Sequence, residues 1–319
     1  MNTKLWLVVP CYNEEEVLPF TADALRKKLR QLCDAGKIRE PRIVFVDDGS
    51  SDQTWEIISS LCSDPMFAAI KLSHNQGHQS ALLAGMMYAK DRCDCVITLD
   101  ADLQDDIDAI EDFIKAYEDG CHVVYGVRND RKTDSGFKRG TAQLFYKLMN
   151  SMGTEIVYNH ADYRLLSAKA LAALSEYEEV NLFLRGIVPL VGLKSGKVYY
   201  SRRVRTAGAT KYPLKKMVNF AFDGITSFSV KPLRFISVLG LLFSLLSVGG
   251  LIYALVSYFS GHTVPGWTAI VCSIWLLGGI QLLGMGVLGE YIGKTYTEVK
   301  HRPRYFIDEI ISREEIPDA

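Results

Sequence analysis

Two aspartates separated by one residue end an apolar stretch near the first third of the chain. They are Asp100 and Asp102, with Ala101 between them and Leu103 and Gln104 directly after. Two carboxylates on the turn after a strand can bind a divalent cation, and Mg²⁺ and Mn²⁺ prefer such oxygen ligands. These ions commonly keep one or two protein carboxylates and leave positions for substrate phosphates. We therefore expect a Mg²⁺ or Mn²⁺ site at Asp100 and Asp102, with Gln104 as an auxiliary ligand.

Two further polar motifs follow apolar stretches. Tyr12 lies in the run Pro10-Cys11-Tyr12-Asn13-Glu14, and Asp47-Asp48-Gly49 follows the next apolar run. An aromatic ring can stack on a base, and a carboxylate can accept a hydrogen bond from a uracil N–H or a ribose hydroxyl. The alternative for Asp47-Asp48-Gly49 is a turn with a helix cap. Together with the aspartate pair, these motifs favour a nucleotide diphosphate as ligand.

The elements that must position these residues alternate along the chain. Short apolar runs predict strands at residues 5–10, 43–46, 69–72, 96–99 and 122–125, with helical patterns between successive strands. This alternation predicts an α/β fold, a Rossmann-like parallel sheet with helices on both faces. Ligands of such sheets bind beyond the carboxyl ends of the strands. The three motifs and Arg128, which follows the fifth strand, are therefore expected in one crevice.

Two long apolar runs near the end of the chain predict membrane spans. Residues 235–259 and 268–289 contain no charged residue, and each run exceeds the ~20 residues that a spanning helix needs. The segment from Ser201 to Arg234 carries eight basic residues against the single acid Asp223. Because basic residues flank the spans and none lies between them, both flanks are expected in the cytoplasm. The protein is thus expected in the cytoplasmic membrane, with its catalytic domain and both termini cytoplasmic.

These features divide the chain into five parts. The expected parts are a cytosolic domain (1–212), an interfacial amphipathic segment (213–232), two transmembrane helices (233–260 and 267–290) and a cytosolic tail (291–319). The seven cysteines are scattered and odd in number, which favours reduced thiols over a disulfide framework. The net charge of −1 gives no reason to expect a nucleic-acid partner.

The motifs in the first half of the chain resemble those of family 2 inverting glycosyltransferases of GT-A fold. They are Pro10-x-Tyr12-Asn13-Glu14, Val46-Asp47-Asp48-Gly49-Ser50-x-Asp52-x-Thr54, Asn75-x-Gly77 and Leu99-Asp100-Ala101-Asp102-Leu103-Gln104. One departure is Asp106-Ile107, which stands where the family usually has prolines.

Later motifs are similar to those of the polyprenyl-phosphate branch of that family. They are Gly126-x-Arg128, Asp162-Tyr163-Arg164-Leu165 and Arg205-x-x-Gly208-x-x-Lys211-Tyr212, with Thr210 where serine is common. That branch includes dolichol-phosphate mannose synthases and bacterial undecaprenyl-phosphate (bactoprenol) glucosyltransferases.

The resemblance implies a role for each matching residue. The residues expected to bind the nucleotide sugar are Pro10, Tyr12, Glu14, Asp47, Asp48, Asp100 and Ala101. Those expected to bind the metal are Asp100, Asp102 and Gln104. Phosphates of the donor or the lipid acceptor are expected at Arg128, Arg139, Arg205 and Lys211. Asp162 is expected near the transferred sugar or the acceptor, as a catalytic group beside Asp100 and Asp102.

The implied reaction is metal-dependent transfer of a sugar from a nucleotide sugar to a polyprenyl phosphate, with inversion, for cell-envelope glycan modification. UDP-glucose is the first choice of donor and UDP-N-acetylglucosamine the second. A phosphate acceptor is already anionic at neutral pH, so Asp162 is expected to orient substrates and not to act as an essential base. Two alternatives stay open: a processive polysaccharide synthase, whose Q-x-x-R-W segment is missing here, and a non-catalytic nucleotide-binding scaffold for a lipid flippase. A flippase partner and a homo-oligomer are further expectations.

Overall fold

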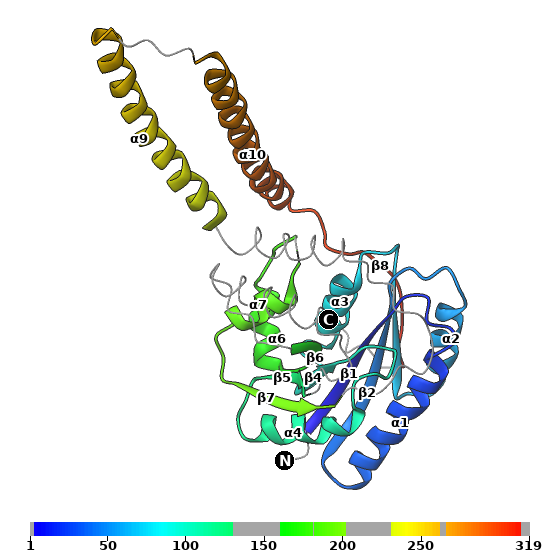
Figure 1. The fold of residues 1–319 in the computed structure, drawn as a ribbon. Coiled ribbons are helices and arrows are strands. Elements are labelled where there is room, and N and C mark those ends of the chain that lie inside the picture. Colours follow the sequence, from blue (N-terminus) through cyan, green and yellow to red (C-terminus); the bar gives the residue numbers. More distant parts are fainter. Residues whose placement is uncertain (1–2, 130–159, 181, 202–230, 262–265, 314–319) are drawn as a thin grey trace. The chain divides into compact units, whose positions relative to one another are not determined.

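The computed structural model describes residues 3–129, 160–180, 182–201, 231–261 and 266–313 (Figure 1). The described residues divide into two compact units. One contains the residues up to Ser201 together with those from His301 on, and the other contains Lys231 to Lys300.

An eight-stranded sheet forms the centre of the first unit, in the order β7-β5-β6-β4-β1-β2-β3-β8. The strands are β1 (Thr3–Cys11), β2 (Ile38–Asp47), β3 (Phe67–Leu72), β4 (Cys95–Thr98), β5 (Val123–Arg128), β6 (His160–Ser167), β7 (Ser195–Tyr200) and β8 (Ile307–Ile311). Most neighbours are parallel, but β6 runs antiparallel to β4 and β5, and β8 runs antiparallel to β3. The predicted α/β fold is confirmed, with a sheet that is mixed and mainly parallel.

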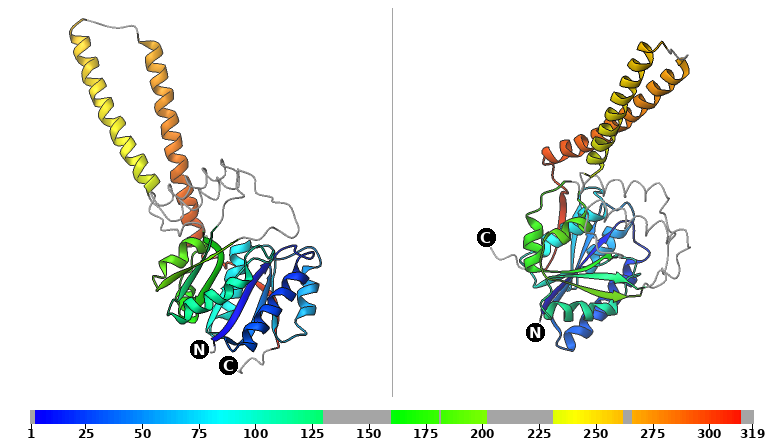
Figure 2. Two further views of the ribbon diagram at one scale, coloured as in Figure 1. Left: turned by 60° about the horizontal axis from the view of Figure 1, so that its bottom comes forward. Right: turned by 60° about the vertical axis from the view of Figure 1, so that its left-hand side comes forward.

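Helices cover both faces of this sheet (Figures 1 and 2). They are α1 (Leu18–Asp34), α2 (Thr54–Leu61), α3 (His78–Ala89), the 3₁₀ helix η1 (Ile107–Ala109), α4 (Ile110–Glu118), α6 (Ala168–Ser175) and α7 (Leu184–Leu190). Side chains of β1 alternate between the faces. Leu7 and Val9 are buried in a cluster with α1 and α4, whereas Trp6 packs against Tyr88 of α3 with ring centroids 6.0 Å apart. Burial on both faces explains why β1 reads as a continuous apolar run.

The strands β1 to β5 match the five predicted from apolar runs, whereas β6, β7 and β8 were not predicted. The last of these, β8, follows the second unit in sequence and completes the far edge of the sheet. Ile310 pairs with Ile70 of β3, and Ser73 N donates to Phe306 O at 3.0 Å. The end of the described chain is therefore part of the sheet.

Two long helices, α9 (Lys231–Phe259) and α10 (Trp267–Val299), make up the second unit. Figure 2 shows them as the two arms of a hairpin. By length and composition both could cross a membrane, with candidate spans at Lys231–Gly250 and Leu276–Val299, and neither span is buried within the structure. Two apolar C-terminal helices were predicted, and both are present. The interfacial segment expected at 213–232 lies outside the described residues except for its last two, which begin α9.

Candidate active site at the carboxyl ends of the strands

The loops that follow β1 and β2 are joined by reciprocal hydrogen bonds. Asn13 N donates to Ser50 Oγ at 3.0 Å, and Ser51 N donates to Asn13 Oδ1 at 2.9 Å. Asn13 adopts a left-handed backbone conformation with φ of 54°, which asparagine tolerates better than most residues. Next to it, Tyr12 is 47% exposed, so its ring is accessible for stacking. Pro10 is buried in β1, paired with Val46 of β2.

Asp47 and Asp48 are both buried, and both carboxylates hold loop backbone. Asp47 accepts from Ser50 N, and Asp48 accepts from Gln76 N at 2.7 Å and from Gly77 N at 3.0 Å. Burial raises the pKa of each carboxyl, and these backbone donors act in the opposite direction. Asp48 therefore fixes the loop between β3 and α3, and a nucleotide would have to use its remaining lone pairs.

Glycine is required at position 49 because two loops meet there. Its φ is +69°, and a Cβ would lie 2.7 Å from Asn75 N and from the carbonyl carbon of His74. Both atoms belong to backbone, so neither can rotate away. Gly49 thus lets the β2 loop support the β3–α3 loop, which leads into His78 at the start of α3.

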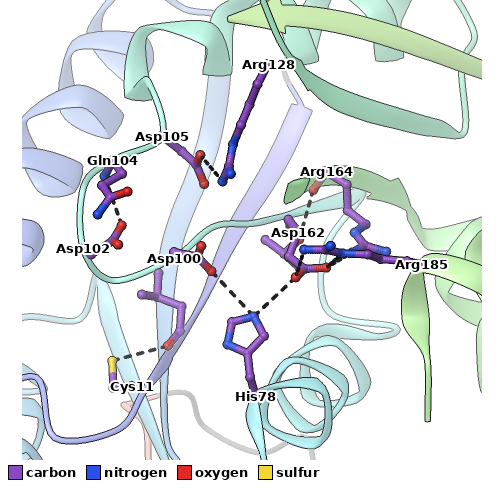
Figure 3. A network of polar contacts seen from close by, with 12 residues as sticks. Cys11, His78, Asp100, Asp102, Gln104, Asp105, Arg128, Asp162, Arg164 and Arg185 are labelled. Carbon is purple, nitrogen blue, oxygen red and sulfur yellow. Dashed lines mark hydrogen bonds and ion pairs between the residues drawn. The ribbon is translucent and has the colours of Figure 1, made fainter. Parts of the chain in front are cut away.

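The loop after β4 carries the predicted metal ligands. Asp100 is directed toward His78, with 3.6 Å between its Oδ1 and His78 Nε2 (Figure 3). Burial raises the pKa of Asp100 to about 6; His78 lowers it and the neighbouring carboxylates raise it further. Asp102 turns instead toward Gln104, whose backbone N donates to its Oδ1 at 3.1 Å. Leu103 between them has a φ of +52°, a strained conformation for leucine.

Asp162 lies on β6 and is surrounded by cationic side chains (Figure 3). It pairs with Arg164, two residues along the same strand face, and with Arg185 of α7, whose Nη2 lies 2.9 Å from Asp162 Oδ2. His78 Nε2 is 3.7 Å from the same Oδ2. Burial raises the pKa of Asp162, but the charges of Arg185 and Arg164 outweigh it and hold the pKa well below its usual range. The carboxylate stays ionised and is therefore a weak proton acceptor.

A third cluster joins Arg128, Asp105 and Tyr200. Arg128 and Tyr200 are register partners on β5 and β7, and Arg128 Nε donates to the Tyr200 hydroxyl at 3.2 Å. Asp105 Oδ1 accepts from Tyr200 at 2.6 Å and from Arg128 Nη2 at 3.2 Å. Burial lowers the pKa of Arg128, but Tyr200 and Asp105 outweigh it and raise the pKa above its ordinary value. Arg128 is therefore a fixed cation.

The structure brings some of the predicted residues together and leaves others apart. Asp100 and Asp162 both contact His78 (Figure 3). The carbonyl of Ala101 accepts a hydrogen bond from the Thr21 hydroxyl. Glu14 N donates to Thr54 Oγ1 at 2.9 Å, again a backbone contact. The predicted phosphate ligands Arg139, Arg205 and Lys211 lie outside the described residues.

Four residues of the site were missed from the sequence: His78, Asp105, Arg185 and Tyr200. His78 directly follows the Asn75-x-Gly77 motif, which was a usable signal. No signal in the sequence identified Arg185 or Asp105, because their partners Asp162 and Tyr200 are distant in sequence.

The donor set at Asp100 fits a divalent cation that is shared with a ligand. Within the described ranges, no three His, Cys, Asp or Glu side chains form a group that could hold a metal by themselves. Asp100, Asp102 and Gln104 supply oxygen atoms on one short loop, and the partial burial of Asp100, whose side chain is 35% exposed, makes its charge costly without a cation. This matches ions that keep one or two carboxylates and fill the rest of their shell from substrate.

The fold and site define an α/β protein with an acidic loop at the carboxyl edge of its central sheet. Residues 6–175 match the model of the family described as glycosyl transferase family 2, and the chain belongs to this family. It is 53% identical over 306 residues to the uncharacterized glycosyltransferase YkoT of Bacillus subtilis (strain 168), covering 95% of this chain and 91% of that one.

Other relatives carry more specific names. The chain is 41% identical over 310 residues to the prophage bactoprenol glucosyl transferase homolog of Escherichia coli (strain K12), covering 96% of this chain and 99% of the relative. The bactoprenol glucosyl transferase of Shigella phage SfV is also 41% identical, over 307 residues, covering 95% and 98%. Among solved structures, the mannosyltransferase PcManGT from Pyrobaculum calidifontis in complex with GDP-Man and Mn²⁺ matches with 13% identity and a TM-score of 0.46, covering 95% and 89%.

Proposed function

We propose that this protein is a membrane-bound inverting glycosyltransferase that moves a sugar from a UDP-sugar, with UDP-glucose as first candidate, to undecaprenyl phosphate. The observation that carries the proposal is the near full-length identity of 41% to proteins named bactoprenol glucosyl transferases. The acidic loop and the two apolar helices support it, because such a reaction needs a nucleotide diphosphate site beside a lipid.

Asp100, Asp102 and Gln104 would hold a divalent ion. When bound, Mg²⁺ or Mn²⁺ would offset charge on the departing nucleotide diphosphate. Tyr12, which is 47% exposed, would stack on the base. Asp48 contributes by holding the β3–α3 loop, which places His78 beside Asp100.

Arginines are proposed to bring the acceptor phosphate toward the donor. Two anions must approach for transfer, and fixed cations reduce their repulsion. Arg128 is such a cation because Asp105 and Tyr200 hold it. Asp162 orients Arg185 and His78 in this proposal, and the acceptor phosphate attacks without a strong protein base because it is already ionised.

A membrane location is proposed from α9 and α10, with both flanks of the hairpin in the cytoplasm. The acceptor is then within the same bilayer as the enzyme's anchor. Assembly with a flippase or into a homo-oligomer stays a prediction.

Membranes that contain the full-length protein, given labelled UDP-sugars, undecaprenyl phosphate and Mn²⁺, test the proposal. We expect a lipid-linked monosaccharide from UDP-glucose, and UDP-N-acetylglucosamine serves as the second donor. The Asp100→Asn variant in the same membranes is the control for background transfer. A polymer would support a polysaccharide synthase, and no product from either donor would contradict the proposal.

A further inference from the structure

One buried carboxylate oxygen in the site has no protein partner among the described residues. It is Oδ2 of Asp105, a residue only 4% exposed. Its neighbour Oδ1 accepts two hydrogen bonds, from Tyr200 and Arg128, so the side chain is ordered. Leaving a buried charged acceptor unsatisfied is costly, and such groups are rare unless something else binds them. This oxygen therefore points to a ligand.

Asp105 lies within the candidate active site. It shares the loop after β4 with Asp100, three residues beyond Asp102. Figure 3 shows the Asp105 side chain directed toward Arg128, above Asp100. A ligand that reaches Asp100 is therefore close to Asp105.

The charges around Asp105 favour a neutral hydrogen-bond donor. The guanidinium of Arg128, 3.2 Å from Oδ1, already balances the carboxylate. A second cation at Oδ2 would be repelled by Arg128, and a phosphate oxygen placed directly at Oδ2 would be repelled by that carboxylate oxygen. A hydroxyl avoids both penalties and gains a hydrogen bond to a charged acceptor.

The acceptor oxygen is also held in a fixed position. Tyr200 and Arg128 are register partners on adjacent parallel strands, and both donate to Oδ1. The Tyr163 hydroxyl donates to the carbonyl of Asp106 at 3.1 Å, which fixes the next residue of the same loop. A preorganised acceptor discriminates between hydroxyl positions.

We infer that Asp105 recognises the sugar of the nucleotide-sugar donor, by accepting one of its hydroxyl groups on Oδ2. The inference rests on the proposed function for the kind of ligand and adds a specificity-determining residue to it. Arg128 and Tyr200 position the carboxylate, and Asp105 decides which sugars are bound. A site built for a hydroxyl strongly disfavours an analogue that lacks it, because the acceptor is then left unpaired.

Calorimetry on the full-length protein in detergent with Mn²⁺ tests this inference without requiring turnover. UDP is compared with UDP-glucose, UDP-galactose and UDP-N-acetylglucosamine, and the tightest UDP-sugar is taken as the probe. In Asp105→Asn, we expect the probe to bind about 10- to 100-fold more weakly, the range for a hydrogen bond to a charged group, while UDP alone changes less than about twofold. Asp106→Asn removes the same charge one residue further on, at a side chain that accepts from Asp108 N, and should change neither affinity.

Three outcomes would overturn the inference. Equal losses for UDP and the probe would mean that Asp105 acts only through Arg128 on the phosphates. No UDP-sugar binding more tightly than UDP to the unmodified protein would mean that no sugar is recognised. If Asp105→Asn does not fold, the binding of deoxy analogues of the probe to the unmodified protein is measured instead. The analogue that lacks the recognised hydroxyl should bind about 10- to 100-fold more weakly than the probe. Equal binding of all the analogues would contradict the inference. The proposed function is tested separately, by the formation of the lipid-linked product, so the proposed function and the role of Asp105 can be contradicted independently.

Discussion

Arg185 donates two hydrogen bonds to the carboxylate of Asp162, from Nη2 to Oδ2 at 2.9 Å and from Nε to Oδ1 at 3.3 Å. This paired geometry uses the planar fork of the guanidinium. The buried Arg164 pairs with Oδ1 of the same carboxylate, so both oxygens of Asp162 are bound to arginine. The arrangement explains how a buried acid at the centre of the site remains ionised, and it separates this residue from the role of a general base.

The first prediction concerns the stability contributed by Asp162. Asp162→Ala leaves Arg164, which is 1% exposed, without its anion, and breaking a buried ion pair costs about 3–5 kcal/mol. Asp162→Asn keeps the shape and should cost less. Thermal unfolding in detergent measures both. Unchanged stability in Asp162→Ala would show that other groups compensate Arg164.

The pH dependence of this contribution has a definite sign. The folded pKa of Asp162 is lowered, below the unfolded value of about 4. The stabilisation is therefore present above pH ~4 and is lost as the pH falls further, because the unfolded state then binds the proton first. The gap in unfolding free energy between the unmodified protein and Asp162→Asn should be smaller at pH 3 than at pH 7.

Asp100 has the opposite pH behaviour. Its folded pKa is raised to about 6. Without metal, the folded state therefore keeps a proton between pH ~4 and ~6 that the unfolded state has released, and the free energy of unfolding decreases as the pH rises through this range. Asp100→Asn removes this loss and should stabilise the metal-free protein by about 1 kcal/mol at pH 7, a small value because the side chain is 35% exposed and solvent screens it. The same variant should lose transfer activity.

Proton and metal compete for Asp100, which gives a second measurement. Metal binding requires the deprotonated carboxylate. Mn²⁺ should bind about tenfold more tightly at pH 7.5 than at pH 5, the ratio expected for one ligand with a pKa of about 6. In Asp100→Asn, binding should be weak and this difference should vanish. Equal Mn²⁺ affinity at both pH values in the unmodified protein would exclude Asp100 as a ligand.

His78 is the described residue whose side chain contacts both Asp100 and Asp162, through the same Nε2. We expect His78→Ala to lower kcat by about 100- to 1000-fold, the usual range for losing one positioned hydrogen-bonding group, without weakening Mn²⁺ binding. His78→Gln, which keeps an N–H donor, should retain more activity than alanine. Equal loss of Mn²⁺ affinity and kcat would instead place His78 among the metal ligands.

The C-terminal strand offers a stability test with a matched control. Ile311 packs against the apolar core, whereas Ile310 beside it is 45% exposed. Ile311→Ala should lower the free energy of unfolding by about 1–2 kcal/mol, less than a fully buried isoleucine, and Ile310→Ala by under about 0.5 kcal/mol. Equal effects would show that β8 does not hold its side chains as described.

The sequence predicted the elements whose residues interact locally. The strands β1 to β5 are short apolar runs buried on both faces, and the motifs at their ends, such as Asp100 and Asp48, follow directly. The strand β6 was not predicted because Asp162 and Arg164 interrupt its apolar pattern with charges. These charges can be buried because Asp162 pairs with Arg164 and with Arg185. The strand β8 was not predicted because its partner β3 lies more than 200 residues away. Contacts of this kind depend on the assembled sheet.

Gly49 allows a last prediction about the loops around the proposed nucleotide site. Gly49 and Gly36 both have a φ of +69°, but only at Gly49 would a Cβ meet backbone, 2.7 Å from Asn75 N, whereas Gly36 has nothing within 4 Å. The left-handed conformation alone costs a residue with a Cβ about 1–2 kcal/mol, so Gly36→Ala measures that term. Gly49→Ala must also push the β3–α3 loop away, which disturbs the contacts of Asp48 with Gln76 and Gly77 and the position of His78. It should therefore lose more stability than Gly36→Ala and weaken UDP binding, while Gly36→Ala leaves UDP affinity unchanged. Calorimetry with UDP on both variants makes the comparison, and equal UDP affinities would separate this loop from the nucleotide site.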